Sequence, residues 1–414
     1  MVDTTAPTAP SAVLFASSLN NSTALSVSWG LSTDDHFDHH NLQLCSDDDC
    51  SVSCISALTS LGSPAVLTGV NNTSYYACVQ GEDVLGQKSA WVASALTASI
   101  DMTAPTVIDV TSAKANGLYT KDEVIDIRVK FSKAVNVTTP GDFMLALNTT
   151  PTRQATYLSG DASDTLVFQY TVNAGDTAAD LGYASATALV LGSGTIQDAA
   201  GNSANVNLPI LTAPNSLVIQ KALVIDTTAP TSPASVGFVS TLVNATTFDI
   251  SWVPSTDAHF ATHNIMLCAA SDCTSSCSAV VTSATSPLAV TGTNGATYYG
   301  CVQGQDTLGL KSQWVSSVQA VTVDSSFPTV TNVSSTAADG AFKLGAVIPV
   351  TVTFSKAVYL TNPTDVGILL ETGATDRRVI YSSGDTTNTL TFNYTVQAGD
   401  TSADLNYESV NALT

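Results

Sequence analysis

The chain repeats itself at a fixed period. Trp29 returns as Trp252, 223 positions later, and the segment Asp3–Pro7 returns unchanged at the same spacing as Asp226–Pro230. Self-similarity at a fixed period is typical of an array of folded units. Because such arrays usually span, hold or bind, we expect several small domains and no enzyme. No nucleophile elbow, phosphate-binding loop, dinucleotide fingerprint or HExxH motif occurs in the sequence.

Four short segments, two in each long repeat, divide the chain again. In each of them an aspartate precedes Thr or Ser residues and a proline, which is typical of an extended joint between domains. These joints are Asp3–Pro7, Asp101–Pro105, Asp226–Pro230 and Asp324–Pro328. They predict four modules, which we name A1 (1–102), B1 (103–225), A2 (226–325) and B2 (326–414).

Module B2 is shorter than B1. After a one-residue insertion near Ser383, Thr414 aligns with Val190, so B2 has no counterpart of residues 191–225. We interpret the sequence as a part of a longer protein. We also expect B2 to be less stable than B1, because B2 has no counterpart of the last strand of B1.

Apolar and polar residues alternate over much of the chain. In B1 the residues 125, 127, 129 and 131 are apolar and those between them are polar or charged, and B2 repeats the pattern from Ile348 to Phe354. A period of two predicts half-buried antiparallel strands. The sequence therefore predicts an all-β fold of tandem Ig-like or fibronectin type III-like β-sandwiches in an extended array.

The composition limits the partners. The chain holds 34 acidic and 13 basic residues, a formal charge of −21. This balance argues against nucleic acids and anionic membranes, which bind basic patches. No apolar run approaches the roughly 18 residues that a membrane-spanning helix needs, so we expect no transmembrane segment.

The eight cysteines form two identical sets of four. An even, repeated count in small Thr- and Ser-rich modules indicates an oxidising compartment and two disulfides in each A module. Four cysteines allow three pairings, and we favour the one that joins two predicted neighbouring strands and closes one polar loop. The favoured bonds are Cys45–Cys78, Cys50–Cys54, Cys268–Cys301 and Cys273–Cys277. A zinc site with four thiolates is the alternative, although paired CxxC motifs are absent.

The A modules resemble fibronectin type III domains. The segment Leu25–Trp29 is similar to the second strand of that fold with its core tryptophan. Tyr75, followed by an apolar strand and the turn Asp83–Gly86, is similar to its corner tyrosine, and A2 repeats these features. The resemblance implies a β-sandwich, while the four cysteines are a departure from ordinary type III domains.

The B modules resemble bacterial Ig-like or cadherin-like repeats of large surface proteins and adhesins. The residues that carry the resemblance include Val129–Ser132 and the turn Asp198-Ala-Ala-Gly-Asn202. The resemblance implies calcium at the joints, since calcium prefers six to eight oxygen ligands. The candidate ligands are Asp3, Asp101, Asp198, Asn202, Asp226 and Asp324. The alternative is turn chemistry alone, in which each aspartate accepts bonds from nearby backbone N–H groups.

All five histidines lie in two short segments. His36 and His40 return as His259 and His263. A His-x3-His pair beside aspartate could hold zinc or copper if the segment were helical. In the fibronectin-like register the segment leads into the third strand, which favours a structural role.

Together these features predict a secreted or surface-anchored bacterial modular protein. The chain would act as a non-catalytic stalk with adhesive properties, contacting an unknown surface ligand or neighbouring modules of the same protein. One alternative is the accessory region of a secreted polysaccharide-degrading enzyme. Another is a carbohydrate- or protein-binding module, for which Trp91 and Trp314 are the remaining aromatic candidates because Trp29 and Trp252 align with core positions.

Overall fold

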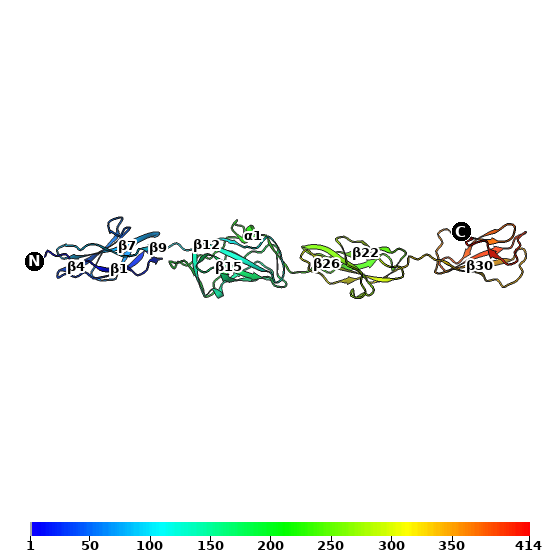
Figure 1. Cartoon of the computed structure of the whole chain (residues 1–414), viewed down its shortest axis with the longest axis horizontal. Coiled ribbons are helices and arrows are strands. Elements are labelled where there is room, and N and C mark those ends of the chain that lie inside the picture. Colours follow the sequence, from blue (N-terminus) through cyan, green and yellow to red (C-terminus); the bar gives the residue numbers. More distant parts are fainter. Residues whose placement is uncertain (1) are drawn as a thin grey trace. The chain divides into compact units, whose positions relative to one another are not determined.

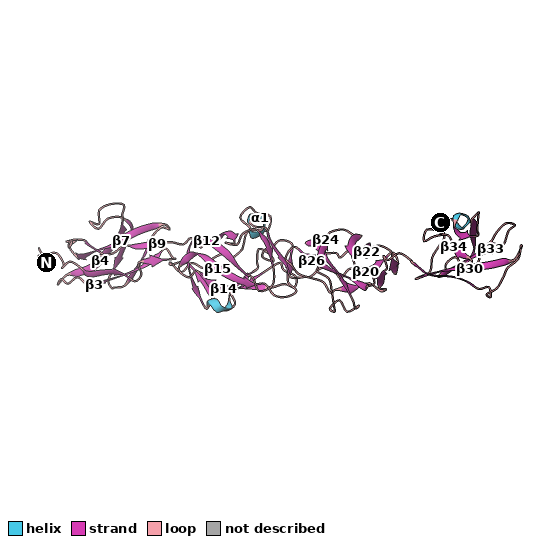
Figure 2. Cartoon of the chain, turned by 45° about the vertical axis from the view of Figure 1, so that its right-hand side comes forward, coloured by secondary structure: helices cyan, strands magenta, loops and turns pink. Residues whose placement is uncertain are grey.

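Strands dominate the structure. It is a computed structural model that describes residues 2–414, and 46% of its residues lie in strands against 2% in helices (Figure 2). The predicted all-β fold is confirmed. Among the described residues, no helix has the length and apolar character needed to cross a bilayer.

The chain forms two compact units. The first comprises the residues up to Pro230 together with the loops Asp257–Phe260 and Gln305–Lys311, and the second comprises the rest. Within these units, four separate hydrophobic cores draw on residues 13–100, 107–225, 236–323 and 333–413. Each core therefore lies inside one of the modules defined above.

Module A1 is a sandwich of two sheets (Figure 1). One sheet has the order β1-β3-β6, and the other has the order β2-β9-β7-β4-β5 with β8 paired to β7. Along β3 every second residue is buried, so Leu25, Val27 and Trp29 face the core. The strands are β1 (Ser11–Phe15), β2 (Leu19–Asn20), β3 (Ala24–Gly30), β4 (Phe37–Cys45), β5 (Ile55–Ser60), β6 (Ala65–Thr68), β7 (Thr73–Asp83), β8 (Val92–Ala93) and β9 (Ala98–Ile100).

The predicted corner tyrosines are present. The hydroxyl of Tyr75 accepts a hydrogen bond from the backbone N–H of Val70 at 3.1 Å. In A2 the hydroxyl of Tyr298 accepts the N–H of Thr293 at 3.0 Å. A tyrosine hydroxyl that bonds back to the backbone a few residues upstream is a hallmark of Ig-like sandwiches.

Module B1 also has two sheets. The larger has the order β10-β12-β15-β14-β13-β17 with β18 paired to β12, and the smaller has the order β11-β19-β16. The elements are β10 (Val107–Thr111), β11 (Gly117–Tyr119), β12 (Val124–Thr138), η1 (Pro140–Asp142), β13 (Met144–Ala146), β14 (Gln154–Ser159), β15 (Ser163–Thr171), β16 (Thr177–Ala178), β17 (Leu189–Val190), β18 (Thr195–Gln197), α1 (Leu217–Gln220) and β19 (Leu223–Asp226).

Module A2 repeats the arrangement of A1. Its sheets have the orders β20-β22-β25 and β21-β28-β26-β23-β24, with β27 paired to β26. The strands are β20 (Ala234–Phe238), β21 (Leu242–Val243), β22 (Thr247–Val253), β23 (Phe260–Cys268), β24 (Val281–Ser283), β25 (Leu288–Thr291), β26 (Thr297–Asp306), β27 (Val315–Ser316) and β28 (Val321–Val323).

Module B2 keeps only the larger sheet of its B1 counterpart. Its order is β29-β30-β33-β32-β31-β34, and no described strand of B2 takes the place of β11, β16 or β19. The elements are β29 (Val330–Ser335), β30 (Val347–Phe354), η2 (Pro363–Asp365), β31 (Gly367–Glu371), β32 (Arg377–Ser383), β33 (Thr389–Thr395) and β34 (Asn406–Tyr407).

All eight cysteines form disulfides, but in another pairing than the one predicted. The predicted bonds Cys45–Cys78, Cys50–Cys54, Cys268–Cys301 and Cys273–Cys277 are wrong. The structure instead joins Cys45 to Cys54, Cys50 to Cys78, Cys268 to Cys277 and Cys273 to Cys301.

Strand register explains the difference. Cys45 and Cys78 do lie on the neighbouring strands β4 and β7, but Cys45 faces Tyr76 and Cys78 faces Gln43. The loop after β4 turns back through Cys50, which has a positive φ of 60°. This turn brings Cys50 within a Cα–Cα distance of 5.8 Å of Cys78.

Candidate functional sites at the module joints

Each joint aspartate first orders its own linker. Its Oδ1 atom accepts the backbone N–H of the residue two positions later, as the turn-chemistry alternative predicts. The four bonds run from Thr5 to Asp3 (3.0 Å), from Thr103 to Asp101 (3.0 Å), from Thr228 to Asp226 (3.0 Å) and from Ser326 to Asp324 (3.3 Å). The Thr5 N–H and hydroxyl, with His36, lower the pKa of Asp3 to about 2.

Each joint aspartate also pairs with a nitrogen of the module that follows it. The partner is a histidine in the A modules and a lysine in the B modules, and it comes 32 or 33 residues later. The pairs are Asp3–His36 (2.9 Å), Asp101–Lys133 (2.7 Å), Asp226–His259 (2.7 Å) and Asp324–Lys356 (2.7 Å). The chain therefore repeats one joint design in two chemical versions.

The backbone of three of these aspartates, Asp101, Asp226 and Asp324, is bonded to the preceding module. The N–H of Asp101 donates to the carbonyl of Asn20 in A1, and the N–H of Asp324 donates to the carbonyl of Val243 in A2. Asp226 ends strand β19 of B1, where it pairs with Thr177. A single residue thus connects the last strand of one module with a side chain of the next.

At Asp3 and at Asp101, a side-chain amide from a turn of the following sandwich also binds the carbonyl group of the joint aspartate. In the turn Asp83-Val-Leu-Gly86-Gln87, the Nε2 atom of Gln87 donates to Asp83 Oδ2 at 3.0 Å and to the carbonyl of Asp3 at 3.2 Å. In B1 the Nδ2 atom of Asn202 donates in the same way to Asp198 Oδ2 at 2.9 Å and to the carbonyl of Asp101 at 2.7 Å. We call this arrangement the amide clasp.

At the joint between A1 and B1, the positive charge beside the aspartates is a lysine side chain of the protein. The ammonium of Lys133 lies 2.7 Å from Asp101 Oδ2 and 3.1 Å from Asp198 Oδ2, and it also donates to the carbonyl of Thr103. Burial alone would lower the pKa of Lys133, but the two carboxylates outweigh it and raise the pKa. The candidate ligands Asp101 and Asp198 therefore come together around an ammonium group, which compensates part of their negative charge, and Asn202 donates to Asp198 beside it.

The joint before A2 lacks the amide clasp. Leu310 stands where A1 has Gln87, although Asp306 Oδ1 still accepts the N–H groups of Leu308 and Leu310. Among the described residues, the buried Oδ2 atom of Asp306 has no hydrogen-bond partner. Burial, together with the charges of Asp226 and Asp257, raises the pKa of this carboxyl group above its ordinary value.

This joint has the donor set of a divalent cation site. One ligand atom each from Asp226, Asp257 and His259 lie within 4.8 Å of one another. Asp306 adds a buried carboxylate close to this set, since the N–H of the next residue, Thr307, donates to the carbonyl of His259 at 2.9 Å. Calcium prefers such carboxylate oxygens, so these residues fit a cation better than those around Lys133.

The predicted histidine pairs are not brought together as metal ligands. His36 and His259 bind the joint aspartates. His40 is fully buried beside Trp29, and its Nε2 atom accepts the N–H of Ser32 at 3.0 Å; His263 accepts the N–H of Ser255 in the same way. The segment is strand rather than helix from Phe37 onward, so residues four apart are separated along β4.

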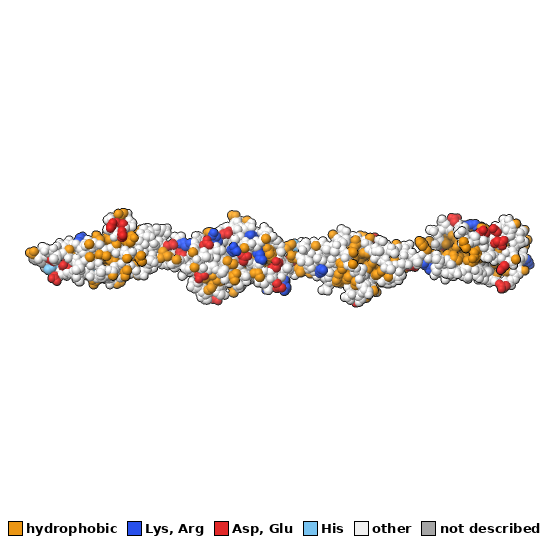
Figure 3. Space-filling model, in the orientation of Figure 1, with side chains coloured by type: hydrophobic (Ala, Val, Ile, Leu, Met, Phe, Trp, Pro, Cys, Tyr) orange, Lys and Arg blue, Asp and Glu red, His pale blue; other side chains and the backbone are white. Residues whose placement is uncertain are grey.

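The tryptophans do not form an exposed platform. Trp29 and Trp252 are buried in the A cores. Trp91 and Trp314 are partly buried and pack against the disulfide-bonded cysteines. On the face shown in Figure 3, white uncharged polar side chains and backbone atoms surround patches of hydrophobic side chains.

The sequence analysis missed several joint residues. Lys133 and Lys356 were not singled out, although the segment Ser-Lys-Ala-Val repeats around them 223 positions apart. Gln87 was not singled out either, and Asp83 and Asp306 were named only as members of a type III-like turn, although the pattern Asp-x-x-Gly also occurs in the B1 turn that was recognised. Comparison of these three turns could have found them.

Comparisons with known proteins add little beyond this. No family model and no curated protein matches the chain. Among solved structures, the crystal structure of the FN1–FN3 domains of chicken CNTN1 is similar with 11% identity and a TM-score of 0.24, over 77% of this chain and 99% of that one. The sheets, the corner tyrosines and the joints define a modular chain of tandem Ig-like β-sandwiches.

Proposed function

We propose that this chain is a non-catalytic stalk and adhesion region of a bacterial surface or secreted protein. The observation that supports it best is the shared aspartate at each joint. Because the backbone of Asp101 and of Asp324 is bonded to one module and the carboxylate to the next, these joints would resist free rotation of the neighbouring sandwiches. A stalk needs this property, and an enzyme scaffold does not require it at every joint.

The disulfides support a location outside the cytoplasm. Each A module carries two of them, and disulfides persist in oxidising compartments. They stabilise modules whose cores are small. Protease resistance outside the cell would follow from this.

The test is whether neighbouring modules tumble together. Residual dipolar couplings of the full chain give an alignment tensor for A1 and one for B1. We expect the two tensors to coincide in the native chain and to diverge in the variant Lys133→Met. Independent tensors in the native chain would contradict the stalk.

Calcium at the joint before A2 forms part of this proposal. The support is the donor set Asp226, Asp257 and His259 with the unpartnered Asp306 Oδ2. We expect calcium to raise the melting temperature of A2 and EDTA to reverse the effect, while A1, whose amide clasp is intact, responds less. An unchanged A2 transition at millimolar calcium removes calcium from the proposal and leaves the stalk untouched.

A further inference from the structure

In modules A1, A2 and B1, the last strand is paired parallel with a strand near the beginning of the module. The pairs are β2–β9 in A1, β21–β28 in A2 and β11–β19 in B1. Tension on the two ends of a module pulls these strands in opposite directions along their length, because parallel strands begin at the same end. All bonds between the two strands are then loaded at once. This pair therefore carries the load directly between the two ends of the module.

The load-bearing pair is shorter in the A modules than in B1. Two residue pairs join the strands in A1 and in A2, and three join them in B1. In B1 the N–H of Leu223 also donates to Asp180 Oδ1 at 3.2 Å, and the N–H of Ala222, just before β19, donates to Asn116 Oδ1 at 3.1 Å. Forced unfolding is governed by the rate of unfolding, so the longer pair with these added bonds should withstand more tension.

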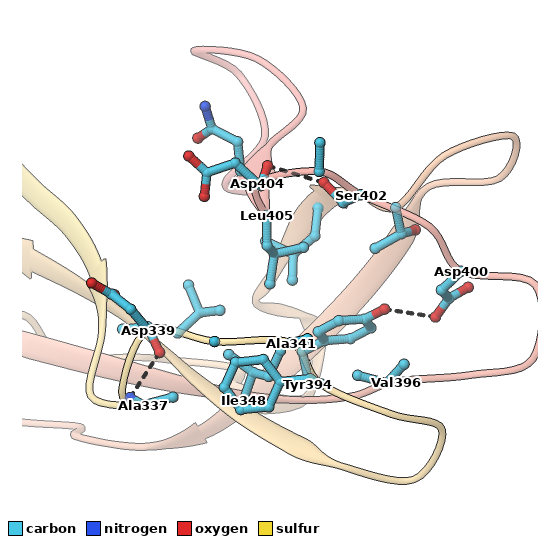
Figure 4. A pocket seen from close by; sticks show the side chains of 18 of the residues that line it. Ala337, Asp339, Ala341, Ile348, Tyr394, Val396, Asp400, Ser402, Asp404 and Leu405 are labelled. Atoms are coloured by element: carbon cyan, nitrogen blue, oxygen red, sulfur yellow. Dashed lines mark hydrogen bonds between the residues drawn. The ribbon is translucent and has the colours of Figure 1, made fainter.

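A buried aspartate secures the point where the chain leaves B1. Asp176 is fully buried and accepts the hydroxyl of Tyr170 at 2.7 Å. B2 has the same bond between Tyr394 and Asp400, which Figure 4 shows. In B1, Thr227, the first residue after β19, donates its hydroxyl to the carbonyl of Asp176 at 2.9 Å. Tension on the chain beyond β19 therefore acts on a residue that is bonded to a buried anchor.

In the A modules a disulfide takes part of the chain out of the load path. Cys50–Cys78 closes a separation of 28 residues, and Cys273–Cys301 closes the same separation in A2. Once A1 unfolds, tension passes from Cys50 to Cys78 through the covalent bond. Strands β5 and β6 lie between these two cysteines, so they carry no load. B1 contains no cysteine, and its whole length is released when it unfolds.

We propose that the A modules limit the tension on the chain: they unfold before B1, and each yields only a short step. The use of this device rests on the stalk proposed above, whereas the order of unfolding and the step lengths are properties of the chain alone. The segment Ser11–Ile100 without the closed loop offers about 60 residues, against about 120 from Val107 to Asp226 in B1. At about 3.5 Å per residue, the B1 step is roughly 200 Å longer. The closed loop also lowers the entropic cost of refolding A1.

The test pulls single molecules of the full chain in optical tweezers, with handles attached to both ends through peptide tags rather than cysteines. We expect two equal short steps from A1 and A2, and the long step of B1 at a higher force. B2 spans about 85 residues without a disulfide and gives a step of intermediate length, so the length of each step identifies its module. A B1 step that precedes the short steps would overturn the proposal, as would A steps of about 90 residues.

The two cysteine pairs of A1 supply matched variants. The double variant Cys50→Ala, Cys78→Ala should lengthen the A1 step by roughly 65 Å, at about 3.5 Å per residue, because only the separation of 9 residues closed by Cys45–Cys54 then carries no load. The double variant Cys45→Ala, Cys54→Ala should leave the step unchanged, because Cys50–Cys78 already gives the shortest path. An unchanged step in the first variant would overturn the proposal. If that variant does not fold, the order and the lengths of the native steps still decide the question.

Discussion

The carboxylate of Asp101 lies 2.7 Å from the Nζ atom of Lys133, and the same ammonium reaches Asp198, whose side chain is only 3% exposed. The variant Lys133→Met would leave two carboxylates facing each other, one of them buried without its counter-ion. Hydrogen bonds to charged groups contribute about 1.5–3 kcal/mol, so we expect B1 to lose about 2 kcal/mol. Urea unfolding followed by residue-resolved NMR of B1 measures the loss.

Lys121→Met is the matched control for this change. Lys121 pairs with Asp122 in an exposed position, where ion pairs contribute about 0–1 kcal/mol. Equal destabilisation by both variants would mean that the joint lysine has no special role.

Leu310→Gln should give A2 the amide clasp of A1. A glutamine amide at this position could donate to Asp306 Oδ2 and to the carbonyl of Asp226, as Gln87 does for Asp83 and Asp3. Because a buried unpaired acceptor costs about 1–3 kcal/mol, we expect A2 to gain about 1 kcal/mol. Differential scanning calorimetry measures the gain in stability. Repeating it with calcium shows whether the ion still stabilises A2 once the glutamine is present.

Gln87→Leu is the reciprocal change and should destabilise A1 by a similar amount. A gain in A1, or a loss in A2 from Leu310→Gln, would contradict the role assigned to the clasp.

The two disulfides of A1 should differ in their contributions to stability. Cys50–Cys78 closes a separation of 28 residues and Cys45–Cys54 one of 9. In the loop-entropy account these correspond to about 3.6 and about 2.6 kcal/mol. We therefore expect the double variant Cys50→Ala, Cys78→Ala to unfold at lower urea than Cys45→Ala, Cys54→Ala; the reverse order would exclude loop entropy as the main cause.

The A modules should lose stability in mild acid. Burial lowers the pKa of His40 and of His263 from the ordinary value of 6.5. The unfolded chain then binds more protons than the folded one below that value, so the contribution is complete above pH 6.5 and is lost as the pH falls through the folded pKa. Melting of A1 and A2 between pH 8 and pH 5 tests this.

His40→Gln and His263→Gln keep a hydrogen-bond acceptor for Ser32 and Ser255 but remove the titration. The difference between native and variant melting temperatures should therefore shrink as the pH falls. A constant difference would assign the acid response to other groups.

The fold was predictable because alternation and repetition are local signals. The inward positions of β3 and β12 follow from the period of two, and the corner tyrosine follows from its place before an apolar strand. The disulfide pairing was not predictable, because it depends on the register of β4 against β7 and on a left-handed turn at Cys50. The joint partners escaped prediction for a similar reason: Asp101 and Lys133 are distant in sequence, and only folding brings them together.

The shared aspartate has a consequence for how such a chain can evolve. A domain inserted by recombination would follow the joint aspartate of its upstream neighbour. It could pair with the carboxylate of that aspartate only if it carried a basic side chain about 32 positions after it. Duplication of an A and a B domain as a pair preserves this match at every joint, because each copy brings its own histidine or lysine. Insertion of an unrelated domain would lose the match. The repeated order of the domains is thus consistent with a requirement that each joint aspartate find a basic partner in the next domain.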